Sequence, residues 1–201
     1  TMNLKEKLNL LEDELTRIES PILRLLRDSN DGFDRDQTAH VLTNLGMCPL
    51  QMVLDFYDWA TGADENILFN INNQVKLSTI GNPAKVSITT SLYMLDATTD
   101  DFFAHRKMLP FIYNGIMEDP ILIDLSPKSK TIGALYYYSP QVTLSVDPIM
   151  IYDSLELWID TMLLCYSNGI YKIKPNGMLV ADVDKEIKIT RELNPHSIYW
   201  D

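Results

Sequence analysis

The apolar residues of this chain change their spacing twice, and this change limits the possible fold more than any other feature. Up to Gly62 they recur every three or four residues, as on helices. They then gather into short segments rich in β-branched and aromatic residues, separated by Asn, Gly, Pro and Asp. A helical spacing returns over 152–169. The predicted strands lie within 66–75, 85–95, 108–115, 119–127, 131–140 and 142–148.

This order of helices, strands, helix and tail predicts an α+β fold. We expect N-terminal helices, a central, mainly antiparallel sheet of about six strands, and a late helix packed on one sheet face. The late helix is expected to start near Asp153, which with Glu156 resembles a capping box, and to end at Gly169. In the tail, Pro175 to Gly177 predicts a hairpin turn, followed by a polar segment.

The N-terminal segment carries one apolar seam. Leucine and isoleucine recur at alternating spacings of four and three between Leu4 and Leu25, which places them on one side of a helix. Two interpretations fit: a coiled-coil homodimer through the Leu4–Leu25 seam, or a helix packed across its own domain. Pro21 interrupts the seam, and this favours the second interpretation.

The 201 residues fit one domain. We expect a single domain over 1–201, in which 1–30 form a helical extension, 34–171 the core, and 172–201 a C-terminal hairpin and tail.

The segment PLQMVLDFYDWATG, residues 49–62, predicts a buried scaffold helix. Gly46 is placed to end the preceding helix in the left-handed conformation that glycine adopts without strain. Gln51, Asp55 and Asp58 form the only polar stripe, which we expect to be exposed. Such a stripe is either solvated or a contact surface, and the solvated interpretation is favoured.

Motifs that carry catalysis or bind metals are missing from the sequence. The three histidines, His40, His105 and His196, stand apart, and Cys48 and Cys165 lack metal spacing. Signatures of nucleotide binding and of a serine nucleophile are also missing. The sequence therefore predicts a protein that is not an enzyme and holds no metal or cofactor. A hydrolase with paired carboxylates is the weakest alternative.

The formal net charge of −11 limits the partners. It repels phosphate backbones and anionic membranes, so we expect neither nucleic acid nor a membrane. It attracts a basic protein, although acidic composition also simply keeps a protein soluble. The first residues alternate charge with leucine, unlike a signal peptide, and the sequence has no disulfide pattern. These features predict a cytoplasmic protein.

Two later strands place polar groups on a second face of the sheet. Because side chains alternate along a strand, Asp124 points away from the isoleucines beside it. By the same rule Tyr136 and Tyr138 share one face. If helices cover the other face, these tyrosines line an open surface, where tyrosine is typical of interfaces. The alternatives are a bond from Asp124 to a turn, and tyrosines under a loop.

Three segments resemble the SUKH superfamily, which includes fungal cell-wall-assembly regulators and bacterial immunity proteins. LGMCPLQMVLDFYDWATG is similar to its helix pair, DPILIDLSPKSKTIGALYYYSP to its strand pair, and DSLELWIDTMLLCYSNGIY to its late helix. The matching positions are Leu45, Gly46, Pro49, Phe56, Tyr57, Gly62, Asp124, Gly133, Leu155, Trp158, Ile159, Gly169 and Tyr171.

The resemblance implies a domain that binds proteins and has no catalytic set. In bacteria it implies an immunity protein that neutralises a cognate toxin, often a basic nuclease, by direct binding. The alternative is a regulatory scaffold or small-ligand-binding module like the cell-wall-assembly regulators. Acidic rim residues would speed association and aromatic anchors would slow dissociation. The candidate interface residues are Asp55, Asp58, Asp64 and Glu65 for the rim, and Tyr136 and Tyr138, with Asp124 beside them, for the anchor.

Overall fold

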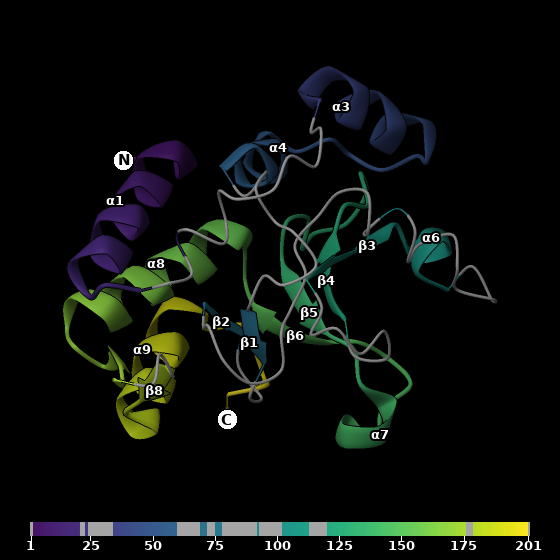
Figure 1. The fold of residues 1–201 in the computed structure, drawn as a ribbon. Coiled ribbons are helices and arrows are strands. Elements are labelled where there is room, and N and C mark those ends of the chain that lie inside the picture. The colour runs from purple at the N-terminus through teal and green to yellow at the C-terminus, as the bar shows by residue number, and fades with distance from the viewer. Residues whose placement is uncertain are drawn as a thin grey trace.

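The fold is α+β, as predicted, with helices packed against a mainly antiparallel sheet (Figure 1). The computed structural model describes residues 2–20, 23, 34–59, 69–71, 75–77, 92, 102–112, 120–175 and 179–200. The helices in these residues are α1 (Leu4–Arg17), α3 (Arg35–Asn44), α4 (Gln51–Trp59), α6 (Phe102–Arg106), α7 (Pro140–Thr143), α8 (Leu155–Ser167) and α9 (Val183–Leu193).

The largest sheet in the described residues has four antiparallel strands in the order β3-β4-β5-β6, not the six predicted. Two further antiparallel pairs, β1 with β2 and β7 with β8, stay separate from it. Of the predicted strand over 85–95, only Leu92 is described. The strands are β1 (Phe69–Ile71), β2 (Val75–Leu77), β3 (Met108–Ile112), β4 (Ile121–Asp124), β5 (Leu135–Tyr137), β6 (Ile149–Tyr152), β7 (Tyr171–Ile173) and β8 (Leu179–Ala181).

The segment 142–148, predicted as a strand, forms the end of α7 and the loop after it. Pro140 lies in the first turn of α7, where its missing N–H needs no partner. Leu144 ends α7 in the left-handed conformation, with φ of 55°. The alternating residues Val142, Leu144 and Val146 fitted a strand pattern, but all three are exposed. Their alternation therefore does not mark a buried face.

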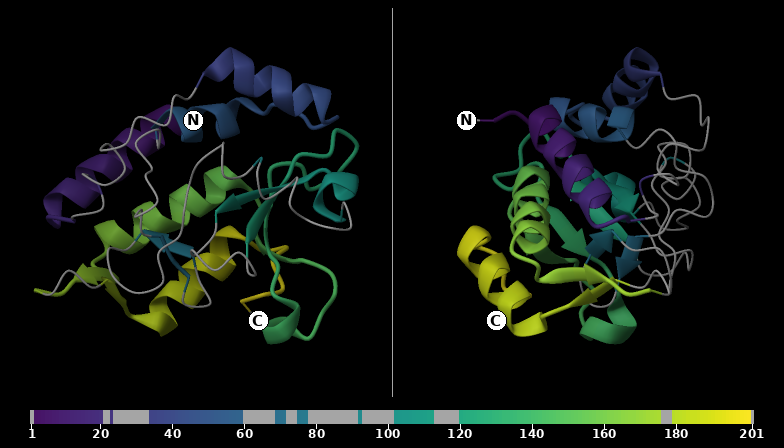
Figure 2. Two further views of the ribbon diagram at one scale, coloured as in Figure 1. Left: turned by 45° about the vertical axis from the view of Figure 1, so that its right-hand side comes forward. Right: turned by 60° about the vertical axis from the view of Figure 1, so that its left-hand side comes forward.

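Helix α1 packs across its own domain. Leu4, Leu8, Leu11 and Leu15 are buried, and α1 contacts α8 and α4. Figure 2 shows α1 running alongside α8, with α9 on the opposite side of α8. The chain itself covers these four leucines, in agreement with the favoured interpretation of the Leu4–Leu25 seam as a helix packed on its own domain rather than a coiled-coil homodimer.

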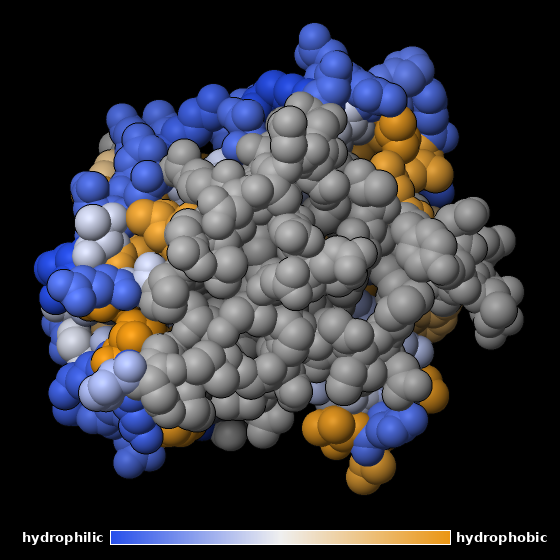
Figure 3. Space-filling view, in the orientation of Figure 1, coloured by the Kyte–Doolittle hydropathy of each residue, from blue (hydrophilic) through white to orange (hydrophobic). Residues whose placement is uncertain are grey.

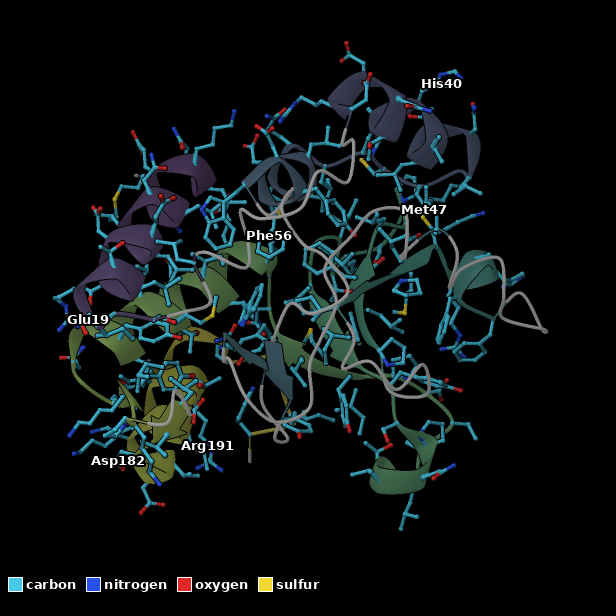
Figure 4. The ribbon with its side chains drawn as sticks, viewed as in Figure 1. Glu19, His40, Met47, Phe56, Asp182 and Arg191 are labelled. Carbon is cyan, nitrogen blue, oxygen red and sulfur yellow. The ribbon has the colours of Figure 1, made fainter. Side chains whose placement is uncertain are left out.

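The end of α1 explains how the seam is interrupted before Pro21. Glu19 adopts a left-handed conformation, with φ of 54°. Its backbone N–H donates to the Thr16 carbonyl at 3.0 Å, and that of Ser20 donates to the Leu15 carbonyl at 2.8 Å. This pair of bonds is a Schellman motif, which usually places glycine where Glu19 lies. Figure 4 shows Glu19 at this end of α1.

Helices α3 and α4 bring an aromatic core onto the sheet. Gly46 follows α3 with φ of 71°, which confirms its predicted capping role. Phe56 on α4 points into the interior (Figure 4). Its ring centre lies 5.0 Å from that of Phe111 on β3 and 5.6 Å from that of Trp158 on α8. The three elements therefore meet at one tilted aromatic cluster.

Helix α8 confirms the predicted late helix, with a different first residue. Ser154 is the N-cap, and its side chain accepts a hydrogen bond from the Leu157 N–H at 3.1 Å. The capping box predicted at Asp153 is therefore wrong. Gly169 follows the helix with φ of 64°, as predicted. The core side chains Trp158 and Ile159 are fully buried.

The C-terminal tail contains a helix that the sequence pattern did not predict. Strands β7 and β8 pair as the predicted hairpin, but the polar segment after them forms α9, which packs on α8. The buried side of α9 carries Glu186 and Thr190, followed by the buried Asn194. Their spacing of four is helical, yet they are polar, so the fully buried positions of this helix carry no apolar signal. The Tyr171 hydroxyl donates a hydrogen bond to Glu186.

The sheet has no open face at its centre. All four residues of β4 are buried, including Leu122 and Asp124 on the side expected to face a partner. The prediction that this side forms an uncovered binding surface is therefore wrong at β4. Strand β4 therefore offers no contact surface.

Candidate functional site

The polar stripe of α4 divides into one buried and one exposed carboxylate. The side chain of Asp55 is 9% exposed, whereas that of Asp58, one turn later, is 54% exposed. Asp55 accepts hydrogen bonds from Arg35 at 2.6 Å and from Gln51 at 2.9 Å. The predicted exposure is thus correct for Gln51 and Asp58 and wrong for Asp55. Asp55 holds α3 to α4, and Asp58 reaches the surface.

A pocket of about 250 Å³ lies between α1 and α4, next to these carboxylates. The Lys5 ammonium lies 3.6 Å from Asp55 and 4.0 Å from Asp58, so it bridges the two acids across the pocket. The Trp59 indole N–H donates to Glu12 at 3.4 Å, which fixes the ring beside the opening. The lining residues are Lys5, Leu8, Asn9, Asp55, Asp58 and Trp59.

This arrangement can bind a polar group of another molecule. Asp55 Oδ1 already accepts hydrogen bonds from Arg35 at 2.6 Å and Gln51 at 2.9 Å, so other atoms must make that contact. Asp58 and Asn9 are exposed hydrogen-bonding groups, and Trp59 offers a partly buried aromatic face. Together these groups can accept a cationic or hydrogen-bonding group from another molecule.

Exposed carboxylates lie on or next to three helices, two of which line this pocket. Acidic side chains outnumber basic ones on α1, α3, α4 and their caps. Figure 3 shows the hydrophilic surface that α1, α3 and α4 form along one side of the molecule. The exposed acids are Glu6, Asp13, Glu19, Asp34, Asp36 and Asp58. We call these residues and the pocket the acidic surface.

Asp124 and Tyr136, predicted as interface residues, belong to an internal hydrogen-bond chain. The Tyr136 hydroxyl donates to Thr131 Oγ1 at 2.8 Å, and Thr131 Oγ1 donates to Asp124 Oδ2 at 3.0 Å. Asp124 Oδ1 accepts from the Ser126 N–H at 2.9 Å. Burial raises the pKa of Tyr136 above its ordinary value. Asp124 therefore fastens the turn between β4 and β5, which was the alternative interpretation of this residue.

The other predicted interface residues do not form a shared surface with Asp58 in the described structure. Tyr138 is half-buried and packs against the rings of Phe102 and Phe103, at 5.4 and 5.1 Å between ring centres. Asp64 and Glu65 lie outside the described residues. Of the predicted set, the structure therefore brings Asp55 and Asp58 together and places Asp124 and Tyr136 elsewhere.

An aspartate–histidine pair was missed by the sequence analysis. His196 Nδ1 lies 2.7 Å from Asp153 Oδ2, and the backbone N–H of His196 also donates to that oxygen, at 3.2 Å. The two residues are 43 positions apart, so no local signal could pair them. The pair fastens the C-terminal segment to the start of α8, while the imidazole stays exposed.

Within the described ranges, no group of three or more His, Cys, Asp or Glu side chains could hold a metal ion. None of the described helices has the length and apolar character to cross a bilayer. The exposed His40 on α3 lies on the outer side of that helix (Figure 4).

The fold and this surface define an α+β domain whose described helices present a carboxylate-rich face with a small polar pocket. No family model, no curated protein and no solved structure matches this chain.

Proposed function

We propose that this chain is a non-enzymatic protein-binding domain that holds a basic protein on its acidic surface. The observation that carries the proposal is the position of Asp58. It is exposed on α4 at the rim of the pocket, beside Trp59, and further exposed carboxylates lie on α1 and α3. An aromatic side chain in a concave site thus occurs beside exposed charges, and protein interfaces typically place aromatic groups at the centre and charged groups at the rim.

The charge distribution supports fast association with a basic partner. The net charge of −11 steers a cationic protein towards the molecule, and the exposed acids give the approach a direction. Steered complexes associate at up to about 10⁸–10⁹ M⁻¹s⁻¹ at low salt. Asp55 contributes little to this attraction, because its side chain is only 9% exposed and accepts a hydrogen bond from Arg35 at 2.6 Å.

We further propose that the partner is a toxin domain and that the chain acts as an immunity protein of the SUKH type in the cytoplasm. The motif resemblance and the acidic charge support this proposal. A nuclease toxin binds phosphates through basic residues, and an acidic domain can cover that surface. Cys48 and Cys165 do not form a disulfide, which is compatible with a reducing compartment.

Coexpression with a toxin domain tests this proposal. The toxin domain encoded next to this chain's gene is produced in cells with and without the chain, and growth and complex formation are measured. We expect growth to be restored and a complex to be purified. Asp58→Lys should weaken binding about twofold to thirtyfold, since an exposed pair is worth roughly 0.2–1 kcal/mol and reversal turns attraction into repulsion.

The matched control is Asp184→Lys, which makes the same charge change on the exposed side of α9, away from the acidic surface. If Asp58→Lys and Asp184→Lys lower the affinity equally, net charge alone explains the loss of binding. Unchanged affinity in both variants would rule out the acidic surface as the binding site.

The pocket supports a second candidate function, a small-ligand-binding or regulatory module. Its volume of about 250 Å³ lies just below the ordinary range for ligand sites of about 300–1,000 Å³. A gene without a toxin gene beside it would favour this candidate. Titration of the purified chain with small organic cations, followed by Trp59 fluorescence, would test it, because Trp59 lines the pocket.

A further inference from the structure

One oxygen of a buried carboxylate at the pocket between α1 and α4 accepts no hydrogen bond from the described residues. The bonds from Arg35 and Gln51 both end on Asp55 Oδ1, which leaves Oδ2 without a donor there. The Asp55 side chain is only 9% exposed, and it lines the pocket. Oδ2 is not among the fully enclosed oxygens that lack a partner, so it stays open to solvent. Since buried carboxylates normally accept on both oxygens, the pocket presents an acceptor for an incoming donor.

Lys5 occupies this side of the pocket without a hydrogen bond to either carboxylate. Its ammonium lies 3.6 Å from Asp55 Oδ1 and 4.0 Å from Asp58 Oδ2, beyond the ~2.7–2.9 Å of a charge-assisted hydrogen bond. The Lys5 side chain is 57% exposed, so water can solvate its ammonium when the side chain turns outward. Lys5 thus supplies a positive charge at this place and is held there weakly.

The ring of Trp59 gives the pocket a preference for a planar cation. Its indole N–H donates to Glu12 at 3.4 Å, which orients the ring, and the buried Leu8 also lines the pocket. A guanidinium stacks on an aromatic face and is more weakly hydrated than an ammonium. It also donates in several directions at once, so one group can reach Asp55 and Asp58, one turn apart on α4. Arginine therefore fits these groups better than lysine.

We propose that this pocket binds one arginine side chain of the basic partner, and that this arginine displaces Lys5. The guanidinium donates to Asp55 Oδ2 and to Asp58 and stacks on Trp59. One cation replaces another, so the charge of the pocket stays the same and the gain in affinity comes from hydrogen bonds and stacking. The volume of about 250 Å³ suits a single side chain, since a whole ligand usually needs about 300–1,000 Å³. Because the identity of the partner rests on the proposed function, the pocket is tested first without a protein partner.

Titration with Nα-acetyl-L-arginine amide measures the preference of the pocket. The full chain is isotope-labelled and followed by heteronuclear NMR, and the indole N–H signal of Trp59 is assigned by its loss in Trp59→Phe. We expect this signal to move saturably, with an affinity at least about threefold higher than for Nα-acetyl-L-lysine amide. Sodium chloride at equal ionic strength is the blank. Asp58→Ala should weaken the arginine probe about twofold to fivefold and leave the fold intact, because Asp58 is exposed.

Lys5→Met tests the displacement of Lys5. Methionine keeps an unbranched, flexible side chain and removes the ammonium that competes with the probe. We expect the affinity for the arginine probe to rise about twofold to fivefold, as exposed ion pairs of this kind allow. The matched control is Lys188→Met, which makes the same charge change at an exposed position of α9. Its effect should stay below about 1.5-fold at physiological salt, where the Debye length is about 8 Å.

Three results would overturn the proposal: a Trp59 signal that the arginine probe does not move, equal affinity for the arginine and lysine probes, or no gain from Lys5→Met beyond that from Lys188→Met. Tighter binding of free L-arginine than of its acetylated amide would also overturn it, in favour of a site for a small molecule.

Failure of the proposed function gives a different result. If the coexpressed toxin domain binds the chain but the arginine probe does not, only the role of the pocket is excluded. If the probe binds with the expected selectivity and the toxin domain does not bind, only the proposed partner is excluded. Where both bind, Lys5→Met should tighten the complex with the toxin domain more than Lys188→Met does.

Discussion

Asp55 and Asp58 lie one turn apart on α4, and we expect their removal to have very different effects. Asp55→Ala deletes a carboxylate that contacts Arg35 at 2.6 Å, Gln51 at 2.9 Å and Lys5 at 3.6 Å. Asp58→Ala deletes an exposed carboxylate whose ion pairs with Lys5 and Arg35 are 4.0 Å long. The two variants remove the same atoms from the same helix, so they differ mainly in burial and contacts.

Asp55→Ala is expected to lower the free energy of unfolding by about 2–3 kcal/mol. A hydrogen bond to a charged group contributes roughly 1.5–3 kcal/mol, and Asp55 accepts one from Arg35. The cost stays within this range because the side chains of Arg35 and Lys5 are 31% and 57% exposed, so water can solvate them after the substitution. Asp58→Ala should cost less than about 0.5 kcal/mol, as for other surface pairs.

Urea unfolding measures both variants by circular dichroism. We expect the midpoint to fall clearly for Asp55→Ala with an unchanged m-value, and to stay nearly constant for Asp58→Ala. For a chain of this size the melting temperature should fall by roughly 4–10 °C in the first case. An intermediate loss is expected for Asp55→Asn, which keeps one acceptor. Equal losses for Asp55→Ala and Asp58→Ala would refute the inference that burial divides their roles.

Glu19→Gly should raise the free energy of unfolding by about 0.5–1 kcal/mol, because glycine relieves the left-handed backbone at the end of α1. Urea unfolding measures this change, and a lower free energy of unfolding would contradict the Schellman geometry. Gly46→Ala should lower it by about 1 kcal/mol in the same assay, since its φ is 71° and the neighbouring Lys107 side chain, 3.4 Å from the added methyl group, is flexible. Burial raises the pKa of Tyr152 and of Tyr171 above the ordinary 10.0. As pH rises, the unfolded chain therefore loses these two protons before the folded chain does. The free energy of unfolding should stay constant below about pH 10 and fall above it by up to ~1.4 kcal/mol per pH unit for each tyrosine. Unfolding followed by circular dichroism at several pH values would show no such fall if these phenols were solvated.

The sequence predicted helices and turns best where an apolar period and a glycine end-signal coincided. Gly46 and Gly169 end their helices with positive φ, as their positions indicated. Helix α9 was missed because its fully buried residues, Glu186 and Thr190, are polar. The Glu186 carboxylate accepts a hydrogen bond from the Tyr171 hydroxyl, and the Thr190 hydroxyl donates to the Glu186 carbonyl. A period of buried polar residues is indistinguishable from a solvated face until the partner side chains are known.

The candidate site shows the same limit for charged residues. Asp55 and Asp58 occupy one polar stripe, and nothing in their neighbours distinguishes them. The distinction comes from Arg35 at the start of α3 and from Lys5 on α1, 20 and 50 positions away. Asp124 is likewise buried because Thr131 and Ser126 supply its hydrogen bonds in the folded turn. Charge counts from sequence therefore overstate the number of acids available to a partner.

Binding at the acidic surface should weaken as salt is added, and this dependence tests the steering argument. The binding depends on exposed charges, and the Debye length falls from about 30 Å at 0.01 M salt to about 3 Å at 1 M. The association rate should therefore fall steeply over that range. Stopped-flow association at several salt concentrations measures this, with Asp58→Lys and the control Asp184→Lys as paired variants. If the association rate does not depend on salt but Asp58→Lys still lowers it, the steering argument is wrong, because the loss then comes from direct contact at Asp58 and not from a long-range field.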